Sequence, residues 1–321
     1  MANFSEIGRS HPRRHAELTD DELQMIDATV LYNLMQQVTT SFISLLSDPN
    51  HLLIIDTRKR IDYEEGHVIT AKWARMTASG SIAIPNLELD CKRNVVVYDN
   101  TTAGLTDAVA PAVDCGRLLY AMGSRNKVNI LKGGYEEFLA RYPFLRTHKT
   151  FYMPRELDEI KPYPFEILPG LLYIGNWRQG NDPEVLKDLH IKAHICISME
   201  DETLWPGRHP DKLRVKMEDS DETPIFKCFS KTLAFIENRI GRKAQPKQAV
   251  LVFDRYGFSL AATVVLAYLM KSKKTDLDSA WQHVKKCMPT LRPNRGFVKH
   301  LSTFEVVTLG AKSTDINDPN F

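Results

Sequence analysis

The chain has 321 residues, enough for about two domains, and its 43% apolar and 26% charged composition is that of a soluble globular protein. A net charge of +2 gives no reason to expect nucleic acid or a membrane as a partner, and the longest apolar run, residues 261–270, is too short to span a bilayer. Five scattered cysteines without a Cys-x-x-Cys pair argue against disulfides or a zinc site and favour a reducing, cytoplasmic compartment.

Residues 1–22 are polar and are predicted to form a mobile N-terminal tail. The basic stretch 11–15 is not followed by an apolar core, so it is not a secretory signal. A mitochondrial presequence remains an alternative, which Glu6 and Glu17 weaken because such segments are poor in acidic residues.

Residues 23–148 alternate between strand-like and helical patterns. The runs 52–55 and 95–98 are short, apolar and β-branched, which is typical of strands in a buried parallel sheet. Residues 128–131 form a further predicted strand, closed by the turn Gly133-Gly134, and helical patterns lie near residues 30–38 and 118–122. This alternation predicts an α/β domain with a parallel sheet.

Residues 149–164 contain several prolines, which favour extended chain and predict a linker between domains. A second α/β domain is predicted over residues 165–312, followed by a C-terminal tail over residues 313–321. Its expected strands are 191–199 and 249–253, and its expected helices begin at Pro183, at Thr223-Pro224, and at residues 277 and 294. The helix 259–273 is apolar almost all round, so we expect it to be the buried central helix.

The segment between strand 249–253 and helix 259–273 has the frame of a phosphate-binding loop, with a glycine for the turn and a serine at the helix start. Five segments in order, residues 167–176, 193–198, 216–220, 254–260 and 293–297, resemble the dual-specificity branch of the protein tyrosine phosphatases. The corresponding loop here consists of Asp254, Arg255, Tyr256, Gly257, Phe258, Ser259 and Leu260.

That family uses a cysteine thiolate as nucleophile, a loop arginine as phosphate clamp and an upstream aspartic acid as general acid. The resemblance places Asp254 at the nucleophile and Leu260 at the clamp. It also places Ala261 where the family has serine and Phe253 where it has histidine. Asp219 corresponds to the general acid, but without a nucleophile it is expected to be only a vestige of that role.

Two other catalytic mechanisms are not supported. No Cys-x-x-x-x-x-Arg motif occurs anywhere in the chain, and an aspartyl-phosphate mechanism would need a second aspartate after Asp254 and a divalent metal. We expect instead that the Asp254 side chain binds the loop N–H groups as an internal anion. A loop that still binds a phosphoresidue, with Arg255 as a substitute contact, remains the rival hypothesis.

The first domain resembles the rhodanese-like module that precedes the catalytic domain in MAP kinase phosphatases. The resemblance rests on residues 54–58, 63–68, 95–98, 131–138 and 142–145. A sulfurtransferase would carry cysteine directly after the strand 95–98, where this chain has Asp99. Asp56, Arg58 and His67 are therefore expected to be structural. The stretch expected to dock a kinase holds only Lys72 and Arg75, a weak basis for such binding.

Both halves together resemble the serine/threonine/tyrosine-interacting-like pseudophosphatases. This resemblance implies a catalytically inactive signalling regulator or scaffold that needs no cofactor. It also implies, as partners, a stress-granule-nucleating RNA-binding protein and a mitochondrial phosphatase, and hence cytoplasmic localisation with an association with mitochondria. Relatives of this type usually keep the loop arginine, so Leu260 departs from their pattern. The alternative is a phosphotyrosine or phosphothreonine reader that shields substrates from active phosphatases.

Overall fold

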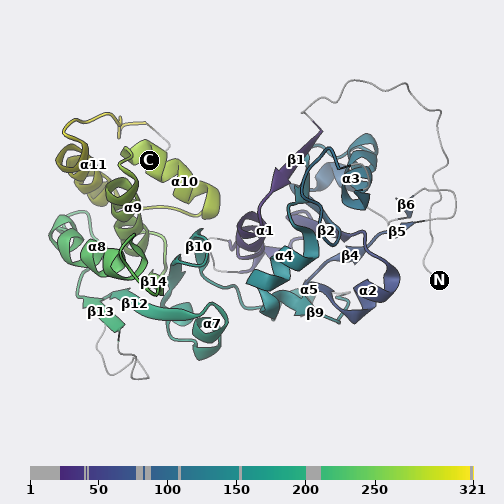
Figure 1. The fold of residues 1–321 in the computed structure, drawn as a ribbon. Helices are drawn as coiled ribbons and strands as arrows, with labels where there is room; N and C mark the ends of the chain where they lie inside the picture. Colours follow the sequence, from purple (N-terminus) through teal and green to yellow (C-terminus); the bar gives the residue numbers. More distant parts are fainter. Residues whose placement is uncertain are drawn as a thin grey trace. The chain divides into compact units, whose positions relative to one another are not determined.

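The computed structural model describes residues 22–39, 41, 43–76, 82–83, 88–107, 110–151, 154–199, 211–318 and 321. They form two compact units, and the main division falls between Lys161 and Pro162 (Figure 1). The tail expected over residues 1–22 lies almost wholly outside the described residues. Both units are α/β with largely parallel sheets, so the predicted fold class is confirmed.

The first unit contains a five-stranded parallel sheet. Its strands, in spatial order, are β1 (Leu23–Ile26), β8 (Val128–Leu131), β7 (Asn94–Tyr98), β2 (Leu52–Asp56) and β4 (Lys72–Trp73). The register pairs Asp56 with Tyr98, so the carboxyl ends of β2 and β7 lie side by side. The three strands predicted at 52–55, 95–98 and 128–131 are confirmed.

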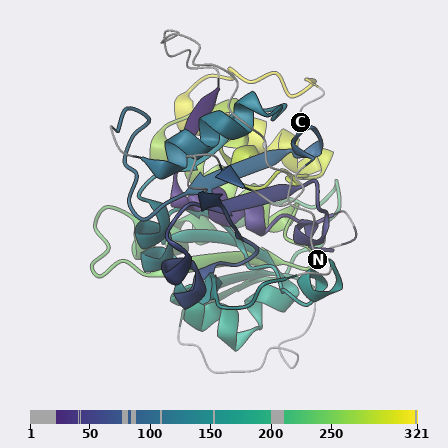
Figure 2. The same ribbon diagram turned by 90° about the vertical axis from the view of Figure 1, so that its right-hand side faces the viewer.

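Four helices accompany this sheet (Figure 2), and the one over residues 111–121 packs against β1, β7 and β8. They are α1 (Ala28–Met35), α2 (Arg60–Glu65), α3 (Pro111–Ala121) and α4 (Gly134–Arg141). Two small antiparallel pairs join β3 (His67–Val68) to β9 (Arg146–Thr147), and β5 (Arg75–Met76) to β6 (Ile82–Ala83). Short 3-10 turns are η1 (Leu45–Ser47), η2 (Leu89–Cys91) and η3 (Pro143–Leu145).

The stretch predicted to be an extended linker contains a short helix, α5 (Pro154–Asp158). Pro154 begins this helix, where the N–H group that proline lacks would have had no intrahelical acceptor. The expectation of extended chain is therefore wrong for these five residues.

The second unit has a five-stranded mixed sheet. Its strands, in spatial order, are β10 (Phe165–Leu168), β11 (Leu172–Asn176), β14 (Ala249–Asp254), β12 (Ile191–Ile197) and β13 (Asp211–Val215). Only β10 is antiparallel to its neighbour. The central strand β14 is hydrogen-bonded on both sides, with Asp254 beside Asn176 and Phe253 beside Cys196. Its last residue therefore lies in the middle of the carboxyl edge of the sheet.

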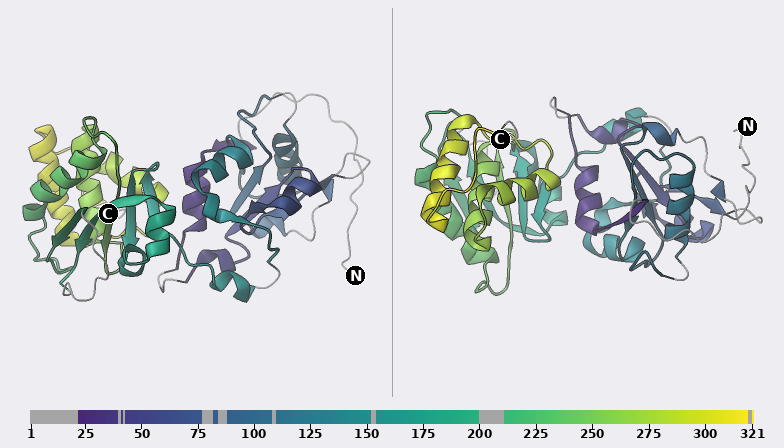
Figure 3. Two further views of the ribbon diagram at one scale, coloured as in Figure 1. Left: turned by 60° about the horizontal axis from the view of Figure 1, so that its bottom comes forward. Right: turned by 90° about the horizontal axis from the view of Figure 1, so that it is seen from above.

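The helices of the second unit are α6 (Trp177–Gly180), α7 (Pro183–Asp188), α8 (Phe226–Ile240), α9 (Leu260–Lys273), α10 (Leu277–Cys287) and α11 (Arg295–Leu309). Asp182 caps α7 as predicted, because its side chain accepts the Glu184 N–H at 3.0 Å. The helix α8 starts two residues after the predicted Thr223-Pro224. Figure 3 shows α8 to α11, in green to yellow, gathered on one side of their sheet.

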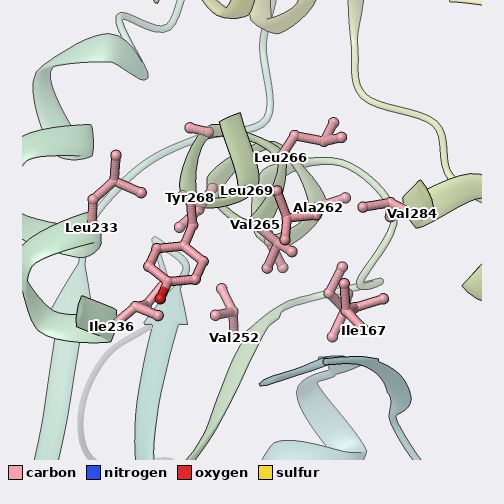
Figure 4. Packing of buried hydrophobic residues seen from close by; sticks show 14 of the residues in the cluster. Ile167, Leu233, Ile236, Val252, Ala262, Val265, Leu266, Tyr268, Leu269 and Val284 are labelled. Carbon is pink, nitrogen blue, oxygen red and sulfur yellow. The ribbon is translucent and has the colours of Figure 1, made fainter. Parts of the chain in front are cut away.

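The central helix α9 is buried from Leu260 to Met270, which confirms the sequence prediction. It packs against β14 and against α8, α10 and α11. Alternate residues of β14 serve opposite faces of the sheet. Val252 lies beneath α9 (Figure 4), whereas Phe253 lies on the other face, against Trp177 of α6. This packing holds both ends of the loop that joins β14 to α9.

Candidate functional site

The loop over residues 255–259 joins the central strand to the central helix. Gly257 has φ +86°, a conformation that favours glycine. A Cβ built at this position would also approach the carbonyl oxygen of Gly175 to 2.8 Å. The strand, turn and helix predicted from the sequence are therefore present, and the turn requires its glycine.

The Asp254 side chain is folded back onto this loop and is only 3% exposed. Its Oδ1 atom accepts the N–H groups of Tyr256 at 2.7 Å and of Gly257 at 2.5 Å. Its Oδ2 atom accepts the N–H of Ala261 in the first turn of α9 at 2.8 Å. The expected contact between Asp254 and the loop N–H groups is thus confirmed, and both carboxyl oxygens are hydrogen-bonded.

The pKa of Asp254 reflects opposing influences. Burial raises it, because a charged carboxylate loses its hydration, and the negative charge of Asp219 acts in the same direction. The three N–H bonds favour the ionised form and lower the pKa, but the net shift is upward. The loop therefore has the N–H donors of an anion site. Their hydrogen bonds offset only part of the cost of burying the charged form of Asp254.

The clamp position has a different environment. Leu260 is 4% exposed and belongs to the hydrophobic core of the second unit. Arg255 is exposed, and its guanidinium carbon lies 5.3 Å from the centroid of the Tyr256 ring. Tyr256 is itself 49% exposed. The loop therefore presents a cation and an aromatic ring to solvent, while position 260 supplies no polar group.

Asp219, at the position of the general acid, ties three segments together. Its Oδ1 atom accepts the hydroxyl of Ser259 at 3.0 Å and the side-chain amide of Asn294 at 2.7 Å. The Asn294 side-chain oxygen caps α11 by accepting the N–H of Phe297 at 2.8 Å. Asp219 thus holds the loop to the start of α11. The sequence analysis noted the segment 293–297 but missed this role of Asn294.

The first unit contains a second loop with the same arrangement, directly after β7. Asp99 is 8% exposed, and its Oδ1 atom accepts the N–H groups of Thr101 at 3.1 Å and Thr102 at 2.8 Å. Its Oδ2 atom accepts the Thr102 hydroxyl and, at 3.4 Å, the N–H of Ala112 in the first turn of α3. At both positions that the sequence resemblance assigns to a nucleophile, an aspartate therefore binds its own loop and the helix that follows.

Asp56, Arg58 and His67 make the structural contacts expected of them. Arg58 forms a buried salt bridge with Asp56, with Nη2 to Oδ2 at 2.7 Å, and donates to the Gly66 carbonyl at 2.8 Å. The Tyr98 hydroxyl donates to Asp56 at 2.7 Å. The ring nitrogens of His67 hydrogen-bond the backbone carbonyls of residues 63 and 149, at 3.0 and 3.3 Å. These bonds hold the loop ends of the sheet.

Lys72 and Arg75, the expected kinase-docking cations, are both exposed, on β4 and β5. Within the described ranges, no group of three or more His, Cys, Asp and Glu side chains could hold a metal ion. In the same part of the chain, no helix is long and apolar enough to cross a membrane.

Each unit matches the model of a known domain family. Residues 39–141 match the rhodanese-like domain, and residues 172–307 match the catalytic domain of dual-specificity phosphatases. Human dual specificity protein phosphatase 16 is 29% identical over 299 residues, an alignment covering 84% of this chain and 43% of that protein. Human dual specificity protein phosphatase 1 is 28% identical over 298 residues, covering 79% of this chain and 78% of that protein.

A crystal structure of DUSP15 is 28% identical in sequence and covers 44% of this chain and 87% of its own, with a TM-score of 0.41. The chain spans less than half the length of phosphatase 16. Both domain matches occur in the order expected from the residues quoted above. The chain therefore consists of a rhodanese-like domain followed by a dual-specificity-phosphatase-like domain, and is related to the MAP kinase phosphatases.

Proposed function

We propose that this protein is a pseudophosphatase, a catalytically inactive regulator that acts by binding other proteins. The observation that supports this most directly is the side chain of Asp254, which occupies the N–H groups that a bound phosphate would need. Asp99 occupies the corresponding loop of the first unit in the same way.

The chemistry of the loop supports inactivity. Phosphatases of this family need a thiolate that attacks phosphorus and a guanidinium that binds two phosphate oxygens. Asp254 has no thiol, and Leu260 belongs to the apolar core. Asp219 could protonate a leaving group, but its carboxylate oxygen already accepts two hydrogen bonds from Ser259 and Asn294.

Electrostatics also oppose phosphate binding. A phosphate would have to displace the carboxyl group of Asp254 from three donors. An ionised carboxylate remaining at about 4 Å would repel each unit of phosphate charge by about 4 kcal/mol at an effective dielectric constant of 20. The absent clamp removes a charged hydrogen-bonding partner worth a further roughly 1.5–3 kcal/mol. We therefore propose that regulation depends on protein surfaces and not on phosphate recognition.

The identity of the partners follows only from the resemblance to the serine/threonine/tyrosine-interacting-like pseudophosphatases. On that basis we propose a scaffold or inhibitor in stress signalling, whose partners include a stress-granule-nucleating RNA-binding protein and a mitochondrial phosphatase. Localisation in the cytoplasm, with an association with mitochondria, belongs to the same proposal.

The test is a pair of measurements on the full chain. Hydrolysis of a small aryl phosphate should not exceed that of buffer, and turnover by the unmodified protein would refute the proposal. Calorimetric titration with a phosphotyrosine peptide and its unphosphorylated twin should give no phosphate-dependent heat.

A phosphoprotein reader is the second candidate. It is favoured by the exposed pair Arg255 and Tyr256, which lies beside the loop and could contact a phosphoryl group. In the same titration, a heat that depends on phosphate would support the reader, and Arg255→Ala should then abolish that heat.

A further inference from the structure

A cavity of about 920 Å³ lies beside the loop of the second unit. It is bounded by the Asp219 segment, the loop itself, α10 and the segment that precedes α11. Aromatic side chains at its walls are Tyr256, Phe258, Trp281 and Phe321. Its cations are Lys285, Arg292 and Arg295, and its acids are Asp219 and Asp221. Apolar walls with a few charged groups are typical of a site that binds a ligand or a peptide.

The acidic side chains of this cavity have hydrogen-bond donors as partners, whereas its basic side chains have no carboxylate partner among the described residues. Asp219 is bonded to Ser259 and Asn294, as described above, and Asp221 accepts the N–H of Gly296 at 3.2 Å. Among the described residues, none of the three cations forms a salt bridge with a carboxylate. Lys285 and Arg295 donate only to the backbone carbonyls of Leu291 and Ile316, at 3.3 and 3.2 Å. The cavity therefore suits a partner that brings negative charge.

The C-terminal segment of the chain already lies against this cavity. Phe321 reaches the cavity wall, with its ring centroid 4.9 Å from that of Trp281. Ile316 packs against the core of the second unit, and its carbonyl accepts the bond from Arg295. Asp315, directly before Ile316, and Asp318, between Ile316 and Phe321, supply two carboxylates. The segment that reaches the cavity through Phe321 thus combines two acidic residues with apolar anchors.

A buried glutamate anchors the beginning of this segment. Glu305 of α11 is 0% exposed, and its Oε1 atom accepts the hydroxyls of Ser313 at 2.9 Å and Thr314 at 2.8 Å. The same atom accepts the N–H of Leu277 at 3.1 Å. The hydrogen bonds of Asp315 and Asn317 are instead local, and the carbonyl of Ile316 accepts its bond from the exposed Arg295. The distal part of the segment is therefore its more weakly held end.

We propose that this cavity is a docking site for an acidic segment of a partner protein with an aromatic or aliphatic anchor. The anchor packs on Trp281, and the carboxylates lie near Arg292 and Arg295. Phe321 and the described residues before it, 315–318, act as a stand-in that the partner displaces. The proposal rests on the proposed function only in that the protein acts by binding proteins.

The test uses a labelled synthetic peptide with the sequence of residues 312–321 as probe, and fluorescence anisotropy on the full chain. Phe321→Ala weakens the resident segment, so it should bind the peptide several-fold more tightly than the parent. In that background, Arg292→Glu should weaken binding roughly tenfold, because an attraction becomes a repulsion. Lys286→Glu is the matched control, since Lys286 is exposed on α10 and does not line the cavity; it should change binding less than twofold.

Several results would overturn the proposal. One is that the peptide binds neither to Phe321→Ala nor to Ile316→Ala, a second variant that weakens the resident segment. Another is that Arg292→Glu and Lys286→Glu change peptide binding equally. If inorganic phosphate, added at constant ionic strength, displaces the labelled peptide, the cavity is a general anion site and not a docking site for an acidic segment. The aryl phosphate assay does not involve the peptide. Hydrolysis would refute the pseudophosphatase proposal alone, and absence of peptide binding would refute the docking site alone.

Discussion

Replacing Asp254 by alanine should destabilise the second unit, because three N–H groups lose their acceptor. Those of Gly257 and Ala261 are buried, and that of Tyr256 is partly buried. A buried donor left without an acceptor costs about 1–3 kcal/mol. Removing a buried carboxyl group recovers part of this loss, since burial disfavours its charged form. We therefore expect the free energy of unfolding to fall by about 2–4 kcal/mol.

The same variant should acquire an anion site, because its loop donors become available. Phosphate should stabilise Asp254→Ala and leave the parent unchanged. A ligand that binds only the folded state at one hundred times its Kd stabilises by about 2.7 kcal/mol. Thermal and urea unfolding of the full chain, with and without phosphate at constant ionic strength, measure both effects.

A suitable control is Asp276→Ala, which removes the cap of α10. Its side chain accepts the backbone N–H of Ser279 at 2.8 Å. It should cost about 1 kcal/mol, with no gain in the response to phosphate. If Asp254→Ala is as stable as the parent, or if phosphate stabilises both proteins equally, the internal-anion explanation is refuted.

Three further predictions concern the phosphatase loop, the loop after β7 and the buried Glu305. Asp254→Cys should stay inactive towards an aryl phosphate because it lacks a clamp, whereas adding Leu260→Arg and Ala261→Ser should raise hydrolysis above that of the single variant and lower stability. Asp99→Ala should lower the free energy of unfolding of the first unit by about 1–3 kcal/mol in urea titrations, without producing sulfurtransferase activity. Burial acts to raise the pKa of Glu305, but its hydrogen bonds outweigh burial and the net shift is downward from 4.5. Its contribution to stability is therefore present above pH 4.5 and lost as the pH falls through the folded-state pKa, so Glu305→Gln should flatten the pH dependence of unfolding in that range.

Much of the fold was predictable because local patterns and tertiary packing agree. The strand 128–131 and the buried helix that begins near Ser259 were placed to within a residue. The contact of Asp254 with its loop was also predictable, since the N–H groups of a turn and a helix start attract an anion placed at the end of the strand. The short helix at Pro154 was missed because proline both ends and begins helices.

The rest of the site depends on side chains that are distant in sequence. Asp219 and Asn294 are 75 residues apart, and neither the spacing nor the composition indicates that they meet. The hydrogen bonds between Glu305 and Thr314 could not be predicted from the sequence either, because a glutamate late in a helix ordinarily faces solvent. A cavity bounded by several segments appears only after the chain has folded. Contacts and cavities of this kind depend on the tertiary structure and have no local pattern in the sequence.

The two aspartates that bind their own loops have a consequence for how the molecule responds to its surroundings. In an enzyme of this type, the N–H groups of the loop are satisfied by a bound anion or by water. Here Asp254 and Asp99 satisfy those donors permanently. The conformation of each loop should therefore stay the same whether phosphate in the cell is abundant or scarce.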